Sequence, residues 1–266
     1  MVGRVYDPRM PDPAAAAQAL LEHRRAKTDP LLDAAVKPAD LDEAYAAHLA
    51  LLELLSADGG GPQIGWKVGF TNATAQARNG ADEPVFAGLL GGVSYVGEAE
   101  LPSPRGTGLG VEPELAVRIG APLSGPVSRQ EAADAINGVA IAIEVVEQRV
   151  RVDEMGLVTM IADGTQQYGS VIGDWNETMD PLTLDQCDVR LQVDGQTDGF
   201  MPATEVLGHP LNAITWLSEA LGRRDLALQP GDVVLTGAIV PAQHLNPGQM
   251  AEVASDGLGD VRLWVD

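Results

Sequence analysis

Lys67 is the residue whose surroundings in the sequence first suggest chemistry. It lies in the alternating stretch IGWKVGF at 64–70, which predicts a strand with period two. On such a strand Lys67 shares one face with Gly65 and Gly69, opposite the large apolar side chains. The two glycines leave room beside the ammonium, so a ligand could approach it. The alternative is a lysine on an edge strand that points to water.

Three glutamates form a candidate set of metal ligands. Glu112 and Glu114 are two residues apart on an expected strand, so their carboxylates project to the same face and a shared divalent cation would relieve their repulsion. Glu144 lies in the most apolar stretch of the chain, where an ionised carboxylate is costly unless it is paired or metal-bound. Such an oxygen set suits Mg²⁺ or Mn²⁺. The alternatives are a solvated edge strand, which Pro113 would favour, and an ion pair between Glu144 and Arg149.

Other catalytic patterns do not fit this sequence. It contains no GxSxG, no GxxxxGK[ST] and no HExxH, and its four histidines are scattered. The glycine-rich stretch 106–110 precedes an expected strand and not a helix, which is the wrong context for a dinucleotide fingerprint. Cys187 stands between acidic residues that would raise its pKa, so we expect a structural role and not a nucleophile.

The elements that must position these residues fall into two parts. Residues 13–57 predict helices: Asp12 caps Pro13 at a first helical position, and a second helix begins at Asp40, which forms a candidate capping box with Glu43. Three glycines at 59–61 end this helix. We therefore expect an N-terminal helical segment over residues 1–60 and a catalytic core over residues 61–266.

The expected core is rich in strands and holds two or three helices. A second capping box, Ser128 with Glu131, predicts a helix that ends near Asn137. An amphipathic pattern predicts a later helix over 211–221. The predicted strands are 64–70, 111–119, 139–146, 233–235 and 261–265.

Composition narrows the class of protein. The 266 residues are 45% hydrophobic and 21% charged, which is typical of a globular chain. A net charge of −21 repels phosphate backbones and argues against a nucleic-acid binder. The charge indicates a solubility or salt-adaptation trait, and the alternative is a field that attracts divalent cations. No apolar run is long enough for a membrane span, and the N-terminus has no apolar signal segment. Together with the single cysteine, these features lead us to expect a cytoplasmic protein.

Several blocks of sequence then come in the order of a known family. The chain resembles the 2-keto-4-pentenoate hydratase and 4-oxalocrotonate decarboxylase family, which belongs to the fumarylacetoacetate hydrolase superfamily. The resemblance spans roughly residues 60–266. The blocks are GWKVGFT at 65–71, GADEPVF at 80–86, VEPE at 111–114, IEVVEQR at 143–149, ADG at 162–164, GHPLNA at 208–213 and GDVVLTG at 231–237.

The resemblance implies an α+β fold with a mixed β-roll core and an N-terminal helical segment. It implies that Glu112, Glu114 and Glu144 hold Mg²⁺ or Mn²⁺, and that Lys67 is the active-site lysine. The substrate would be a short 2-oxo or 2-hydroxydienoic acid, and the metal would stabilise its enolate. Homo-oligomers, and a complex with a pathway hydratase or decarboxylase, are also implied. The positions expected at the substrate are Phe70, Val85, Asp163, Gln166, Thr236 and Gly237.

The sequence departs from the family pattern at two places. Hydratases of the family usually read Pro-Asp-Phe where this chain has Val85, and that aspartate is thought to join the lysine in proton transfer and water addition. Because decarboxylation needs mainly an electron sink, Val85 favours decarboxylation. The second departure is ADGTQQ at 162–167, where relatives usually read Ala-Asp-Asn followed by small residues. We expect a pocket reshaped for an unusual substrate.

The leading hypothesis is therefore a Mg²⁺-dependent lyase that decarboxylates a 2-oxo-dicarboxylate resembling 4-oxalocrotonate. The first alternative is a hydratase of 2-hydroxypenta-2,4-dienoate. The second is a non-catalytic paralogue that binds a partner enzyme. A C–C hydrolase of the wider superfamily would need a water-activating base, commonly a histidine, and no motif block other than 208–213 contains one.

Overall fold

A computed structural model describes residues 12–106 and 108–266 of the chain. The first residues of the chain, in which we expect no signal segment, lie outside the described residues. Thr107 of the glycine-rich stretch also lies outside them. Among the helices of the described part, none has both the length and the apolar character that crossing a bilayer requires.

Two N-terminal helices, α1 (Pro13–Ala26) and α2 (Leu41–Leu55), pack against each other, and α2 also contacts the core. Asp12 caps α1, and Asp40 accepts a hydrogen bond from the Glu43 backbone N–H at 2.9 Å, as the sequence predicts. The Asp40 capping box is incomplete, because the Glu43 carboxylate accepts from the Ala39 backbone N–H. A π-turn, η1 (Ser56–Gly60), follows α2 and includes two of the three glycines.

The larger sheet is mixed and has the strand order β2-β1-β10-β5-β6-β7-β3, with β11 also paired to β5. The β1–β10 and β3–β7 pairs are parallel and the other pairs are antiparallel. Its strands are β1 (Gln63–Gly69), β2 (Val85–Leu90), β3 (Ser94–Val96), β5 (Leu109–Ile119), β6 (Ile136–Val146), β7 (Gln167–Ile172), β10 (Val233–Leu235) and β11 (Gln243–Leu245).

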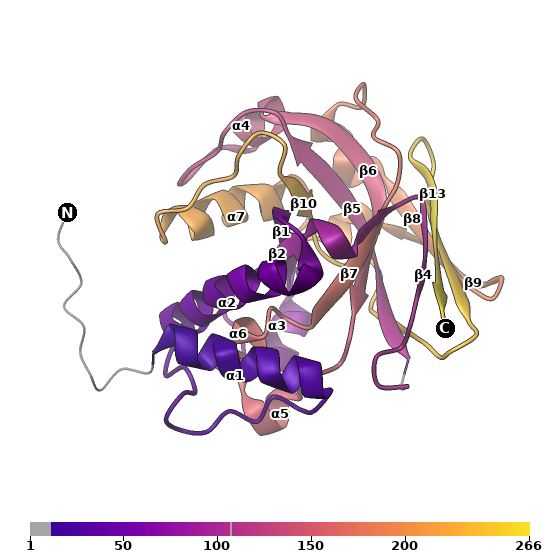
Figure 1. Cartoon of the computed structure of the whole chain (residues 1–266). Helices are drawn as coiled ribbons and strands as arrows, with labels where there is room; N and C mark the ends of the chain where they lie inside the picture. Colours follow the sequence, from indigo (N-terminus) through magenta and orange to yellow (C-terminus); the bar gives the residue numbers. More distant parts are fainter. Residues whose placement is uncertain (1–11, 107) are drawn as a thin grey trace.

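A five-stranded sheet packs against this larger sheet, with β12 and β13 against β6. Figure 1 shows its strands at one side of the molecule and most of the helices at the other. The strands, in order, are β4 (Glu98–Leu101), β13 (Gly259–Val265), β12 (Met250–Ser255), β8 (Asp188–Val193) and β9 (Gln196–Pro202). The remaining helices are α3 (Ala73–Asn79), α4 (Arg129–Asp134), α5 (Val152–Met155), α6 (Leu157–Ala162) and α7 (Leu211–Gly222).

The two faces of β5 and β6 have different surroundings. Side chains such as Leu115 and Ile143 point into the main hydrophobic core. Ala116 and Ala142 belong to a smaller apolar cluster on the opposite face. Because side chains alternate along a strand, Glu112, Glu114 and Glu144 share the face of this smaller cluster.

Some expected boundaries are wrong. The Ser128–Glu131 capping box is present, but α4 ends at Asp134 and not near Asn137, because β6 already begins at Ile136. The described core carries five helices, α3 to α7, where we expected two or three. The additional ones span only four to seven residues, which is too short to produce a helical period in the sequence.

Candidate active site

The site lies where the strand pairing of β5 is interrupted. On one side β5 pairs with β6 throughout, but on the other side β10 pairs only with 116–118 and β11 only with 109–111. The segment after β10 bridges this gap, where the Ile239 N–H donates to the Pro113 carbonyl at 2.9 Å. Pro113 therefore lies in a central strand, and the edge-strand alternative for the glutamate pair is wrong.

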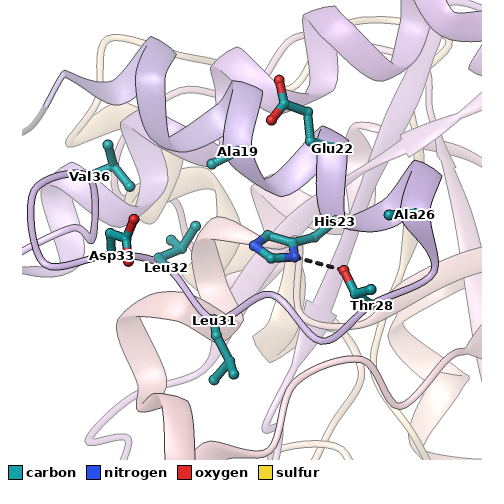
Figure 2. A pocket seen from close by; sticks show the side chains of 9 residues that line it. All are labelled: Ala19, Glu22, His23, Ala26, Thr28, Leu31, Leu32, Asp33 and Val36. Carbon is teal, nitrogen blue, oxygen red and sulfur yellow. Dashed lines mark hydrogen bonds between the residues drawn. The ribbon is translucent and has the colours of Figure 1, made fainter.

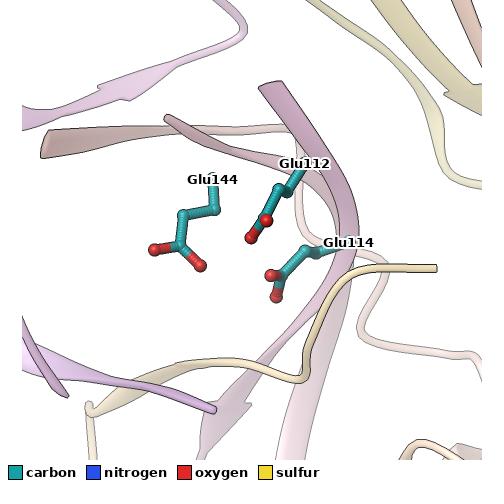
Figure 3. Close-up of side chains that lie close together, drawn as sticks. All are labelled: Glu112, Glu114 and Glu144. Atoms are coloured by element: carbon teal, nitrogen blue, oxygen red, sulfur yellow. The ribbon is translucent and has the colours of Figure 1, made fainter. Parts of the chain in front are cut away.

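Three carboxylates converge on this gap (Figure 3). Glu112 lies directly opposite Glu144 in the β5–β6 register, and Glu114 follows on the same face. One carboxylate oxygen from each residue lies within 4.8 Å of the other two. Glu114 and Glu144 are completely buried and Glu112 is partly exposed. Each could contribute one oxygen ligand to a metal ion.

Lys67 completes the cluster from β1. Its side chain is buried, and Nζ lies 3.0 Å from Oε1 of Glu144. Burial lowers the pKa of Lys67, but Glu144, Glu112 and Glu114 together raise it above its ordinary value. The ammonium therefore stays charged at neutral pH. The alternatives of a solvent-facing Lys67 and of a Glu144–Arg149 pair are both wrong.

The carboxylates carry more negative charge than one ammonium can balance. Burial and the nearby Glu144 raise the pKa of Glu112 to about 7. Burial, Glu144 and Glu112 raise the pKa of Glu114 well above its usual range, although Lys67 and a backbone hydrogen bond oppose this shift. Such a cluster either takes up protons or requires a cation.

Two buried oxygens support the second possibility. Among the described residues, Oε1 of Glu114 and Oε2 of Glu144 have no hydrogen-bond partner. Unpartnered buried carboxylate oxygens are costly, and hard oxygen donors are the ligands that Mg²⁺ and Mn²⁺ prefer. The residues present thus fit a divalent cation.

Thr236 and Gly237, both predicted at the substrate, follow β10 beside the glutamates. The Gly237 N–H donates to Oε2 of Glu114 at 2.7 Å, and the Thr236 hydroxyl donates to the Leu115 carbonyl at 3.0 Å. Gly237 has φ 116°, and a Cβ there would lie 2.5 Å from Thr71. Only glycine fits this position, so its N–H is held against Glu114.

Val85 shares the face of Lys67 on the neighbouring strand. It pairs with Gly69, and a Cβ added at Gly69 would lie 3.3 Å from Cγ2 of Val85 and 3.4 Å from Nζ of Lys67. The residue at position 85 and the ammonium therefore border the same small space. An acidic side chain at position 85 would lie close to the lysine.

Phe70 and Gln166 each contact the region around Val150. Phe70 packs against a small cluster that contains Val150, and the Gln166 side chain donates to the Val150 carbonyl at 3.1 Å. Both adopt left-handed backbone conformations, with φ 56° and 67°. Non-glycine residues rarely do so and are found preferentially at functional sites.

Asp163 is engaged by two arginines. Its carboxylate is fully buried and lies 3.1 Å from Nε of Arg24 and 2.9 Å from Nη2 of Arg149. Burial alone would raise its pKa, but the two guanidinium groups lower it below its usual range. No described contact joins Asp163 to the three glutamates. Its expected place at the substrate stays a prediction.

Two residues of this region were not identified from the sequence. His48 of α2 is buried, and its Nε2 accepts a hydrogen bond from the Gly88 backbone at 3.0 Å. Burial and the charge of Arg24 lower the pKa of His48 to about 3, so it is neutral. The apolar helical spacing of Tyr45, His48 and Leu52 could have indicated its burial, whereas nothing in the sequence indicates that Arg24 reaches Asp163.

Two cavities lie away from the glutamates. One, drawn in Figure 2, has a volume of about 400 Å³ and is lined by residues between 19 and 36, where His23 contacts Thr28. The other has a volume of about 350 Å³ and lies beneath α1 and α2.

The chain is similar in sequence to known proteins of one family. The sequence model of the fumarylacetoacetate (FAA) hydrolase C-terminal family matches residues 64–266. The 2-keto-4-pentenoate hydratase 2 of Dechloromonas aromatica (strain RCB) is 31% identical over 252 residues, which cover 92% of this chain and 95% of that protein. A 4-oxalocrotonate decarboxylase of a Pseudomonas species is 29% identical over 208 residues, covering 76% and 78%.

A solved structure has the same fold. The 4-oxalocrotonate decarboxylase from Pseudomonas putida G7, complexed with magnesium and adipate, superposes with a TM-score of 0.85 at 22% identity, covering 96% of this chain and 97% of that one. The α+β fold that the resemblance implies is thus confirmed. With the family model matching most of the chain, the protein belongs to the fumarylacetoacetate hydrolase family, among the 2-keto-4-pentenoate hydratases and 4-oxalocrotonate decarboxylases.

Proposed function

We propose that the protein is a divalent-metal-dependent lyase that decarboxylates a short 2-oxo-dicarboxylate of the 4-oxalocrotonate type. The observation that carries the proposal is the convergence of three carboxylates and a buried lysine beside an apolar residue, Val85. The relative from Pseudomonas putida G7, whose structure contains magnesium and a dicarboxylate, supports the substrate class.

Glu112, Glu114 and Glu144 would hold the cation, most simply Mg²⁺ or Mn²⁺, because they supply hard oxygen donors and a negative excess. The bound ion would polarise the 2-oxo group of the substrate and stabilise negative charge on it. The Gly237 N–H keeps Glu114 oriented, so the ligand set is arranged before substrate arrives.

Lys67 would act through its charge. Loss of CO₂ breaks the bond between the departing carboxylate and the carbon chain and leaves an electron pair that becomes a dienolate. The ammonium of Lys67, whose Nζ lies 3.0 Å from Glu144, would stabilise this negative charge. Lys67 would therefore work as an electrostatic stabiliser.

Val85 would decide between the two reactions of the family. Adding water requires a group that positions and deprotonates it, and a valine facing Lys67 can do neither. Decarboxylation requires only the electron sink and a proton for the enolate oxygen of the product. An apolar wall also excludes water from the intermediate.

The second candidate is hydration of 2-hydroxypenta-2,4-dienoate. It is favoured by the hydratase names of relatives that are 30–32% identical to the chain. In that case the water would have to be positioned by a group other than the residue at 85.

The test is an ultraviolet assay of purified protein with 2-oxohex-3-enedioate and 2-hydroxypenta-2,4-dienoate, each with Mg²⁺ and with EDTA. We expect Mg²⁺-dependent loss of the first acid only. Val85→Asp should introduce hydration of the second acid, whereas the near-isosteric control Val85→Asn should not. Strong hydration by the wild type that Val85→Asp leaves unchanged would refute the decarboxylase assignment.

A Glu112→Gln variant separates these outcomes from a non-catalytic protein. We expect it to lose activity on both acids and to retain less divalent metal than the wild type. If the wild type holds no divalent metal and the substitution changes nothing, the enzyme assignment is wrong.

A further inference from the structure

The cavity beneath α1 and α2 is separate from the cluster of Lys67 and the three glutamates, none of which lines it. Its walls come from both helices, from β2 and from the start of β7. Its volume of about 350 Å³ falls within the range of small-molecule sites.

The side chains around this cavity are net positive, whereas the whole chain is net negative. The protein as a whole has 17 Lys and Arg residues against 38 Asp and Glu residues. The cavity is lined by four basic residues, Arg24, Lys27, Arg105 and Arg149, and by two acidic residues, Asp58 and Glu147. When the ion-pair partners Arg25, Asp29 and Asp163 are included, five cations stand against four carboxylates, and Lys27 is the cation that makes no ion pair within the described residues. A local positive excess in so acidic a protein favours an anion at this place.

Three of the cations are fixed in place by partners, Arg24 by Asp163 and the other two by carboxylates near the cavity wall. Nη1 of Arg149 lies 3.0 Å from Glu147, and Arg105 contacts both Glu147 at 2.9 Å and Asp29 at 2.7 Å. These pairs leave the walls rigid, so an incoming anion would not have to order them. Preorganised donors reduce the entropic cost of binding.

One hydrogen-bond donor that lines the cavity has no partner among the described residues. Gln167 is 92% buried, and among the described residues its side-chain nitrogen has no hydrogen-bond partner. A buried amide N–H without a partner is unfavourable, so a ligand that accepts a hydrogen bond from it would be favoured. Arg24 lines the same cavity, and the buried Asp163 already pairs with its Nε at 3.1 Å.

Apolar side chains complete the walls. Leu52, Leu55, Leu90 and Val93 line the same cavity as the cations. An inorganic anion would gain nothing from them, whereas the carbon chain of an organic acid would. The combination of guanidinium, amide and leucine is the chemistry of a carboxylate attached to a short hydrocarbon.

We propose that this cavity binds a small organic carboxylate independently of the metal site, with Arg24, Lys27 and Gln167 as its contacts. It is a second site for acids of the kind that the proposed reaction would use or release, and its occupancy does not require the lyase chemistry.

The test is calorimetric titration of the whole protein with adipate in the presence of EDTA, which removes any contribution from bound metal. We expect binding that persists in EDTA and weakens as ionic strength rises. Arg24→Gln and Gln167→Leu should each weaken adipate binding by about tenfold. The uncharged analogue hexane-1,6-diol should not bind.

Arg129→Gln is the matched control, because Arg129 is an exposed cation on α4 that contacts Asn212 and does not line the cavity. We expect it to bind adipate like the wild type. Since Arg24→Gln removes a buried partner of Asp163, Lys27→Glu provides a second variant at an exposed position and should also weaken binding. Thermal unfolding checks that each variant is folded.

Loss of all adipate binding in EDTA would overturn the proposal, as would equal affinities of the Arg24, Lys27 and Arg129 variants. The outcome is independent of the proposed function. A protein that is inactive on both dienoic acids but still binds adipate in EDTA would retain the second site and lose the lyase assignment.

Discussion

Single residues at the site are held in place by contacts that leave little freedom. Lys67 is surrounded by carboxylates, and the Gly237 N–H points at one of them. Thr71 closes the space behind Gly237, since a Cβ there would lie 2.5 Å from its side chain. The position of Glu114 therefore depends on a residue that carries no functional group of its own.

Gly237→Ala should destabilise the protein and weaken metal binding together. The added Cβ collides with Thr71, so the backbone must move and the 2.7 Å hydrogen bond to Glu114 is lost. We expect a loss of about 2–4 kcal/mol in the free energy of unfolding. Urea denaturation and calorimetric titration with Mn²⁺ measure the two effects.

Gly231→Ala is the control for this prediction. Gly231 also has a left-handed φ, 96°, but a Cβ there meets nothing within 4 Å. It should cost only about 1 kcal/mol and leave Mn²⁺ affinity unchanged. Equal effects of the two variants would mean that backbone conformation alone, and not the contact with Thr71, explains the glycine.

At the scale of elements, local sequence patterns predicted the features that lie within a single strand. The period of two was enough to place Glu112 and Glu114 on one face. The gap between β10 and β11, which the segment containing Gly237 bridges, depends on where two distant strands end and has no local signal. The same is true of the Arg24–Asp163 pair, whose members are 139 residues apart in the sequence.

Helix α2 contributes a buried titratable group that should shape the acid stability of the fold. The pKa of His48 falls from 6.5 to about 3 on folding, so between these pH values the unfolded chain binds the extra proton. Stability should therefore decrease as pH falls from 6.5 towards 3. His48→Gln, which can still accept from the Gly88 N–H, should make this decrease shallower.

Urea unfolding of wild type and His48→Gln at a series of pH values checks the slope. His23→Gln is the control, since His23 is only partly buried and contacts Thr28 at the edge of α1. It should leave the slope as in the wild type. A wild-type slope in His48→Gln would show that another group causes the acid sensitivity.

At the scale of the whole molecule, the net charge of −21 has opposite consequences for the two kinds of ligand. A negative field concentrates divalent cations near the glutamates and repels the acids that the enzyme would bind. The cationic cavity beneath α1 and α2 is a local exception to this field. High ionic strength should thus weaken metal binding and reduce the repulsion of the acids.

The effect of Glu112→Gln on the stability of the whole protein should reverse when metal is added. In the metal-free protein the pKa of Glu112 rises from 4.5 to about 7, so the folded chain binds the extra proton and stability is lost as pH rises through this range. At pH 8 in EDTA, Glu112→Gln should therefore unfold at a higher temperature than the wild type. With Mg²⁺ the order should reverse, because the wild type gains the free energy of metal binding.

Thermal unfolding in EDTA and in excess Mg²⁺ measures this reversal, with the exposed Glu100→Gln as the control for removing one negative charge. Glu100→Gln should unfold like the wild type in both conditions. If Mg²⁺ raised the unfolding temperature of Glu112→Gln as much as that of the wild type, Glu112 would not be a ligand. The reversed order of the unfolding temperatures of wild type and Glu112→Gln thus connects the charge of three side chains to the stability of the whole chain.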